Sequence, residues 1–292
     1  MELLKKELKE KPAAERSPAK LGEAVGLSRS TIFRHLHESG SASSTNHEIE
    51  LRGQIQSIAL EMRSYGYRPI TKELHRRDVI VNHKRVLRLL REDNLLCLRQ
   101  RAFVRTTDSN HALTVYPNLA RGLVLSNINQ LWVSDITYIR LRREFVYLAV
   151  VLDAYSRRCI GWALSRHIDT ELALKALRMA LETRTVPPGL VHHSDRGVQY
   201  AAADYVALLQ EHKIQISMSR TGNPYDNAKA ERFVRTLKYE EIYLNDYETL
   251  AEVLASVQHF IEAVYNRKRL HSAIGYLPPV EFEASLSPQI LS

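Results

Sequence analysis

The hydrophobic period of the chain changes near residue 130, and no other feature constrains the fold as strongly. Leu131–Ile139 alternates between apolar and polar residues, as a half-buried strand does. Phe145–Leu152 is an unbroken apolar run of eight residues, which suits a central strand buried on both faces. Upstream of residue 106 the apolar residues instead recur at helical spacing. The chain is therefore predicted to join a helical N-terminal part to an α/β domain.

A mixed sheet covered by helices is predicted for residues 126–284. Three strands follow one another first, and strands then alternate with helices, which is typical of an α/β domain. The strands are predicted over 131–139, 145–152, 158–165, 189–193 and 214–217, and the helices over 169–184, 202–212, 224–243 and 247–267. Residues 106–125 are interpreted as a connector and 285–292 as a tail.

The N-terminal part is predicted to hold two small all-helical helix-turn-helix modules. In the first, at 1–38, two short helices flank a Gly26 turn and Ser28 can cap the second helix. Residues 39–46 are small and polar, which indicates a flexible linker. The second module, at 47–105, is more basic, with Thr71 and Asn82 as expected helix caps. A plain helical hairpin would give the first pattern equally well, and both interpretations stay open.

Positive charge is concentrated in this N-terminal part. Residues 1–110 hold 21 Lys and Arg against 14 Asp and Glu, whereas residues 111–292 hold 20 against 19. On the predicted helix over 83–94, an apolar face points inward and a basic face points outward. Phosphate contact is the expected use of that basic face, although a merely solvated surface would have the same composition. The expected DNA contacts on it are Lys84, Arg85, Arg88 and Arg91.

Several protein classes are disfavoured by composition. Cys97 and Cys159 are the only cysteines in the sequence, too few for a disulfide framework or a cysteine-rich zinc site. No apolar run approaches the ~18–20 residues of a membrane span. The first residues lack the apolar core of a signal peptide. We therefore expect an intracellular protein with no membrane partner.

Two acidic residues occupy unusual positions in the predicted strands. Asp135 lies mid-strand among apolar neighbours, where a buried carboxylate is costly unless it is paired or binds a metal. Asp195 follows a short apolar strand and precedes Gly197, so it lies at the edge of the sheet where open sheets keep their sites. Asp135 on a solvated edge strand, or Asp195 as a helix cap or turn residue, would be the structural alternatives.

A third carboxylate, Glu231, lies on the predicted helix over 224–243. The small residues Ala228 and Ala230 would let this turn approach the sheet closely. Helical spacing places Asn227, Arg235 and Lys238 on the same stripe as Glu231, and these three are expected to contact DNA. An exposed helix with a Glu231–Arg235 pair would show the same spacing.

Together the three acids suit metal-dependent phosphodiester chemistry. Such a reaction needs both the attacking and the leaving oxygen stabilised, which two metal ions ~4 Å apart can do. Mg²⁺ prefers carboxylate oxygens and keeps substrate phosphate among its other ligands. Because the chain has 33 acidic residues, spacing alone identifies no site.

Four ordered motifs resemble the catalytic subunit (OrfB) of insertion-sequence-three family transposases, within the retroviral-integrase-like group. The 35 residues between Asp195 and Glu231 match the spacing of that family's acidic triad. The stretch from GYR at 66–68 to KRV at 84–86 also resembles the family's helix-turn-helix. The four motifs are WVSDITY at 132–138, HSDRGVQY at 193–200, GNPYDNAKAE at 222–231, and YNR, RLHS and GY within 265–276.

The resemblance implies a ribonuclease-H-like core with a mixed five-stranded sheet. It places Asp135 on the first strand, Asp195 after the fourth and Glu231 on a following helix, as catalytic residues and ligands of two Mg²⁺ (or Mn²⁺) ions. It implies cleavage of insertion-sequence ends in double-stranded DNA, followed by attack of the freed 3′-hydroxyl on a phosphodiester of target DNA. A homo-oligomer of at least two copies, a bacterial cytoplasmic location at the nucleoid, and an upstream OrfA partner or fusion would accompany this activity.

Some positions fall outside the triad or depart from the family pattern. Asp153 matches a frequent family position but is interpreted as structural. Arg232 stands where the family usually has a small residue, which leaves the metal ligands intact but alters packing or DNA contact. No counterpart of the retroviral zinc module is found. A catalytically idle DNA-binding regulator and a nuclease that hydrolyses without joining remain the alternative functions.

Overall fold

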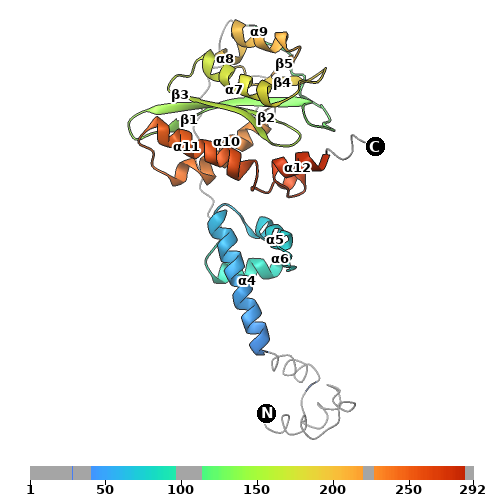
Figure 1. Cartoon of the computed structure of the whole chain (residues 1–292), viewed down its shortest axis with the longest axis vertical. Coiled ribbons are helices and arrows are strands. Elements are labelled where there is room, and N and C mark those ends of the chain that lie inside the picture. Colours follow the sequence, from blue (N-terminus) through green and yellow to red (C-terminus); the bar gives the residue numbers. More distant parts are fainter. Residues whose placement is uncertain (1–27, 29–40, 97–113, 220–226, 287–292) are drawn as a thin grey trace.

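The computed structural model describes residues 28, 41–96, 114–219 and 227–286. The predicted first helix-turn-helix at 1–38 lies outside these residues apart from Ser28. Within the described ranges, a three-helix N-terminal module is followed by a sheet with helices on both faces (Figure 1). None of the helices described there is long and apolar enough to cross a membrane.

The N-terminal module consists of α4 (Ser41–Glu61), α5 (Tyr67–Arg76) and α6 (His83–Glu92). Asn82 caps α6 as predicted, because its side-chain oxygen accepts a hydrogen bond from the Lys84 N–H at 2.8 Å. The three helices share one apolar core, which includes Leu51, Ile55, Ile58, Ile70, Leu74, Val86, Leu89 and Leu90. The inward-facing residues predicted for α6 are thus confirmed.

Two local predictions for this module are wrong. Residues 41–46, predicted as a flexible linker, belong to α4. Their Ser, Ala and Thr residues cost a helix only a few tenths of a kcal/mol each, so they continue the helical segment that follows. Thr71 does not cap α5, because that helix already begins at Tyr67. The Thr71 hydroxyl donates instead to the Tyr67 carbonyl at 2.7 Å.

The described residues form a five-stranded sheet with the order β3-β2-β1-β4-β5. β1, β2 and β3 pair antiparallel, whereas β4 and β5 run parallel to β1. The mixed five-stranded sheet expected from the sequence is therefore confirmed. The strands are β1 (Leu131–Arg140), β2 (Phe145–Asp153), β3 (Cys159–Ser165), β4 (Val191–Ser194) and β5 (Gln215–Met218).

Helices cover both faces of this sheet (Figure 1). One face packs against α7 (Thr170–Thr183), α8 (Val198–Ala201) and α9 (Ala203–Glu211). The other face packs against α10 (Ala228–Glu240) and against α11 (Leu250–His259), which continues as the π-helix η3 (Phe260–Tyr265). The remaining elements are the 3₁₀-helices η2 (Ile242–Leu244) and η4 (Ser272–Ile274), and α12 (Pro279–Leu286).

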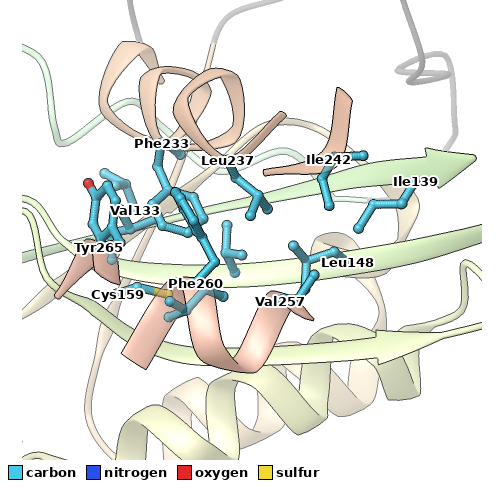
Figure 2. Close-up of a cluster of buried hydrophobic side chains, with 14 of the residues drawn as sticks. Val133, Ile139, Leu148, Cys159, Phe233, Leu237, Ile242, Val257, Phe260 and Tyr265 are labelled. Atoms are coloured by element: carbon cyan, nitrogen blue, oxygen red, sulfur yellow. The ribbon is translucent and has the colours of Figure 1, made fainter. Parts of the chain in front are cut away.

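The core under α10 and α11 fixes α10 against the sheet (Figure 2). Phe233 and Leu237 of α10 are almost fully buried in it. The Phe233 ring packs edge-on against Tyr265, with 4.6 Å between the ring centroids. Such an aromatic pair stabilises by ~0.5–1.5 kcal/mol beyond its buried area. The first turn of α10, which carries Glu231, is therefore held at a defined place on the sheet.

The N-terminal module contacts the C-terminal segment of the core. The Tyr65 hydroxyl accepts a hydrogen bond from the Leu270 N–H at 2.6 Å, and the Leu270 side chain is buried in the core of the module. Arg76 forms a two-pronged ion pair with Glu281 of α12, at 2.9 and 2.6 Å. The buried apolar contact and the hydrogen bond dock the basic α6 onto the rest of the chain.

Candidate active site

Asp135 lies in the middle of β1, where its Cα pairs with that of Val150. Its side chain is half-buried between the buried residues Ser134 and Ile136. One carboxylate oxygen accepts a hydrogen bond from the Ile136 N–H at 2.9 Å. Because β1 is the central strand of the sheet, the alternative of a solvated edge strand is excluded.

Asp195 immediately follows β4, the parallel neighbour of β1. Val133 of β1 pairs with His193 of β4, so the next residues along both strands bring Asp195 beside Asp135. The Asp195 carboxylate accepts a hydrogen bond from the Gly197 N–H at 2.9 Å. This turn orients one carboxylate oxygen and leaves Asp195 at the carboxyl end of the strand, as the sequence predicted.

Glu231 lies in the first turn of α10 and is exposed. Of the two small residues predicted to allow close approach to the sheet, only Ala230 is buried, while Ala228 faces solvent. Asn227, predicted to contact DNA, is only 5% exposed. Its amide nitrogen donates to the Ser134 carbonyl of β1 at 2.9 Å. The structure thus corrects the DNA-contact prediction for Asn227, because its side chain joins α10 to β1.

The three carboxylates act on one another electrostatically. Burial, with smaller contributions from the negative charges of Asp195 and Glu231, raises the pKa of Asp135 to about 8. Partial burial and the Asp195 charge also raise the pKa of Glu231. Lys238 opposes the shift at Asp135, and its ammonium lies 4.2 Å from the centroid of the Tyr138 ring. The fold therefore gathers like charges, which a bound cation would neutralise.

Two histidines beneath this site, which the sequence reasoning missed, support β4 and its neighbours. His192 Nε2 is hydrogen-bonded to the Ser134 hydroxyl at 2.7 Å and the Tyr205 hydroxyl at 3.0 Å. Burial lowers the pKa of His192 to about 3, so its ring is neutral. Both ring nitrogens of His193 are hydrogen-bonded to serine hydroxyls of β5 and the residue after it. The sequence signal was two polar rings inside a short apolar strand.

The donor set at this site fits a hard divalent cation. It consists of carboxylate oxygens, which Mg²⁺ and Mn²⁺ prefer. Within the described ranges, no three Asp, Glu, His or Cys side chains are grouped closely enough to hold a metal ion by themselves. Mg²⁺ keeps waters and substrate phosphate among its ligands, so the protein supplies only part of its coordination shell. We infer that Asp135, Asp195 and Glu231 would supply the protein ligands.

The raised pKa of Asp135 gives a testable pH dependence. In the unfolded chain the group ionises near 3.8, but in the folded chain only near 8. The contribution of Asp135 to the free energy of unfolding is therefore most favourable below about pH 4, and this advantage is lost as the pH rises toward 8. Asp135→Asn is expected to raise the melting temperature of the metal-free protein at pH 8 by several degrees, and by much less at pH 4.5.

Thermal unfolding in the presence of a chelator measures this effect. The exposed Asp204, replaced by Asn, provides the matched control and should show no comparable gain. Adding Mg²⁺ at pH 8 should stabilise the wild type but not Asp135→Asn. Equal melting temperatures for the wild type and the Asp135 variant across this pH range would contradict the electrostatic account.

Gly197 leaves room for the Asp195 carboxylate because glycine has no side chain. A Cβ at this position would lie 3.0 Å from the Asp195 Oδ1 and 3.1 Å from the Gln199 Oε1, so one of them must shift. The Gly197 φ of −63° is ordinary, so alanine adds no backbone strain. Gly197→Ala is expected to lower metal-dependent activity ~10-fold while stability changes little. A kinetic assay combined with thermal unfolding checks this, and unchanged kinetics would show that the carboxylate position is not critical.

The basic residues of α6 divide into two groups. Lys84 and Arg91 are exposed. Arg85 and Arg88 both form ion pairs with Glu48 of α4, and Arg88 also pairs with Glu92. Such half-exposed pairs contribute little stability and exchange readily for phosphate. All four residues therefore remain predicted DNA contacts.

The basic residues predicted on α10 have different surroundings. Arg235 is exposed, with its guanidinium carbon 5.6 Å from the Tyr239 ring centroid. Lys238 is half-buried beside Asp135. Burial lowers the pKa of Lys238, and the Asp135 charge partly restores it. Both residues flank the carboxylates and remain predicted contacts of a DNA strand.

Comparison with known protein families covers both parts of the chain. Integrase core domain families match residues 126–224 and 212–279, and an HTH-like domain family matches residues 47–103. Transposase InsF for insertion sequence IS3A of Escherichia coli is 40% identical over 220 residues, which cover 75% of this chain and 76% of that protein. The chain belongs to the insertion-sequence-three family of transposases.

Further relatives agree with this assignment. The insertion element IS600 31 kDa protein of Shigella sonnei is 37% identical to this transposase over 89% of its chain and 96% of the relative. Among solved structures, the catalytic core domain of BIV integrase is 21% identical, with a TM-score of 0.43, and covers 56% of this chain and 99% of that one. The family match and the InsF relative confirm the expected enzyme class, an integrase-type (DDE) transposase.

Proposed function

We propose that this transposase cleaves insertion-sequence ends and joins them to target DNA at a centre formed by Asp135, Asp195 and Glu231. The observation that carries the proposal is the convergence of these three carboxylates from β1, the end of β4 and α10. Asp195 and Glu231 lie close enough to Asp135 for their charges to add to the effect of burial, and together these raise the pKa of Asp135 to about 8. Such repulsion between acids is tolerated where a cation is to bind.

Two Mg²⁺ (or Mn²⁺) ions bound there would stabilise the attacking and leaving oxygens of a phosphodiester exchange. Asp135 and Asp195 are fixed by hydrogen bonds from the Ile136 and Gly197 N–H groups. Asn227 holds the first turn of α10, and so Glu231, at a set distance from β1. The chain thereby positions the ligands before DNA arrives, which lowers the cost of reorganisation during the reaction.

The basic residues supply the DNA-binding part of this proposal. α6 would place Lys84, Arg85, Arg88 and Arg91 against the phosphates of double-stranded element ends. Arg235 and Lys238 would contact the strand that enters the carboxylate centre. Pairing of two element ends requires at least two copies of the chain, and an upstream OrfA partner or fusion would supplement end recognition. We place this activity in the bacterial cytoplasm, at the nucleoid.

Product analysis on a labelled element-end duplex with Mg²⁺ tests the proposal. We expect a nicked strand with a free 3′-hydroxyl, followed by a longer strand-transfer product joined to target DNA. Cleavage without any joined product would identify a nuclease instead. Binding without cleavage, also in the presence of an upstream partner, would identify a DNA-binding regulator.

A further inference from the structure

A pocket of about 590 Å³ lies beside the first turn of α10, at the end of the core near η4 and α12. Lys229 of α10 and Arg157 of the β2–β3 turn are the charged residues that line it. The remaining lining is apolar, aromatic or small, and no carboxylate belongs to it. The wall includes Leu123, Leu125, Tyr155, Ile274, Leu277 and Phe282.

The two cations of this pocket have no ion-pair partner in the part of the chain that the structure describes. Neither Arg157 nor Lys229 forms an ion pair with any residue that the structure describes. The Arg157 Nε is buried and has no hydrogen-bond acceptor there. Burial and the mutual repulsion of the two cations lower the pKa of Lys229. Both residues are partly buried, and a partly buried cation without an ion pair is costly, so a bound anion would stabilise this arrangement.

The charged neighbours offset the two cations only in part. The Asp153 carboxylate opposes the lowering of the pKa at both Lys229 and Arg157, but it forms no ion pair with either, and its oxygens accept hydrogen bonds from other groups. Oδ1 accepts hydrogen bonds from the Tyr155 and Ser156 N–H groups, and Oδ2 accepts one from the Asn129 N–H. This agrees with the structural role expected for Asp153. Arg232 adds further positive charge near Arg157.

The backbone at Arg157 is left-handed. Its φ is +67°, a left-handed conformation that costs a non-glycine residue of order 1 kcal/mol or more. The conformation is maintained by the Asp153 turn, whose carbonyl accepts a hydrogen bond from the Arg157 N–H at 2.9 Å. This turn directs the Arg157 side chain to the pocket.

We propose that this pocket binds one nucleotide of a DNA strand, with its phosphate between Arg157 and Lys229. The phosphate supplies the missing anion, and Arg157 can donate to it in a planar fork. The sugar and base would lie against the apolar wall that holds Tyr155 and Phe282. The volume is in the range of pockets that enclose a small ligand of this size.

The proposed nucleotide site depends on the proposed DNA function and adds a binding position to it. Lys229 lies two residues before Glu231 on the same helix, but it faces the pocket rather than the carboxylates. A DNA strand bound in the pocket would be anchored beside the reacting phosphodiester, and the pocket residues would not contact that phosphodiester. Lys229 is accordingly a DNA-positioning residue, and its loss should weaken binding rather than metal-dependent chemistry.

Fluorescence anisotropy of the full-length protein with a labelled single-stranded oligonucleotide, without divalent metal, tests this proposal. Lys229→Gln is expected to weaken binding ~10-fold at 0.15 M salt and to lower the slope of log affinity against log salt by about 0.7. Lys229→Arg keeps the cation and should bind like the wild type. The exposed Lys213, replaced by Gln, is the matched charge-removal control and should behave like the wild type.

Competition with small ligands defines what the pocket holds. Thymidine monophosphate should displace the oligonucleotide from the wild type more effectively than either thymidine or inorganic phosphate, and this advantage should vanish in Lys229→Gln. Equal binding by Lys229→Gln and Lys213→Gln would overturn the proposal, as would inorganic phosphate competing as well as the nucleotide. Because no metal is present, this outcome is independent of whether the protein cleaves DNA.

Discussion

Asp195→Asn is expected to slow Mg²⁺-dependent strand cleavage and joining at least ~10³-fold, a loss of about 4 kcal/mol of transition-state stabilisation. The amide has nearly the same shape as the carboxylate, and its oxygen can still accept the Gly197 N–H. The fold should therefore survive. What is lost is a negative ligand for a hard cation, which a neutral amide replaces poorly. Glu231→Gln is expected to have the same effect from the opposite side of the site.

Single-turnover kinetics on a labelled element-end duplex measure this loss. DNA binding without metal should stay within about twofold of the wild type, because the expected DNA contacts lie elsewhere. Glu211→Gln, at an exposed position on α9, is a matched control and should retain full activity. Rates within tenfold of the wild type for Asp195→Asn or Glu231→Gln would remove that residue from the catalytic centre.

Gly161→Ala is expected to lower the free energy of unfolding by about 3 kcal/mol or more. Gly161 lies on β3 directly under α7. A Cβ at this position would lie 2.1 Å from the Ala176 carbonyl oxygen and 2.9 Å from the Ala180 nitrogen. Both atoms belong to the helix backbone, so no side-chain rotation can relieve the clash. The strand and the helix would have to separate, which exposes the apolar residues between them.

Gly53→Ala provides the contrasting substitution for this prediction. Gly53 is exposed within α4, and a Cβ there would meet no heavy atom within 4 Å. Alanine should therefore stabilise the helix by up to ~1 kcal/mol. Denaturant unfolding of the two variants gives both values. A Gly161→Ala protein as stable as the wild type would show that β3 and α7 are not packed as closely as described.

Regular elements of this fold were predictable because each strand and helix carries its own periodic pattern. The apolar run Phe145–Leu152 identified β2 to within one residue, and the helix predicted over 169–184 is α7, which Asp169 caps. The segment predicted as one helix over 247–267 begins later, at Leu250, where Thr249 accepts a hydrogen bond from the Glu252 N–H. It also changes to a π-helix at Phe260, which depends on tertiary packing rather than on local pattern.

The acidic residues of the candidate site stand out in the sequence, whereas the residues that position them do not. Asp135 was conspicuous because a carboxylate in a central strand is costly, and Asp195 because it ends a strand. Asn227 was misassigned because helical spacing gives the direction of a side chain along its helix but not what covers that face. Its contact, Ser134, lies 93 residues away in the sequence. The histidine–serine network under β4 depends on similar distant contacts.

Counting the Mn²⁺ ions that the protein binds on a non-cleavable element-end duplex tests the central claim most directly. Electron paramagnetic resonance of free Mn²⁺ during a titration at pH 8 gives this number. We expect two ions per carboxylate centre for the wild type, consistent with two-metal phosphodiester exchange. Asp135→Asn, Asp195→Asn and Glu231→Gln should each lose at least one of them. The same number of ions with the same affinity in the wild type and all three variants would contradict the account.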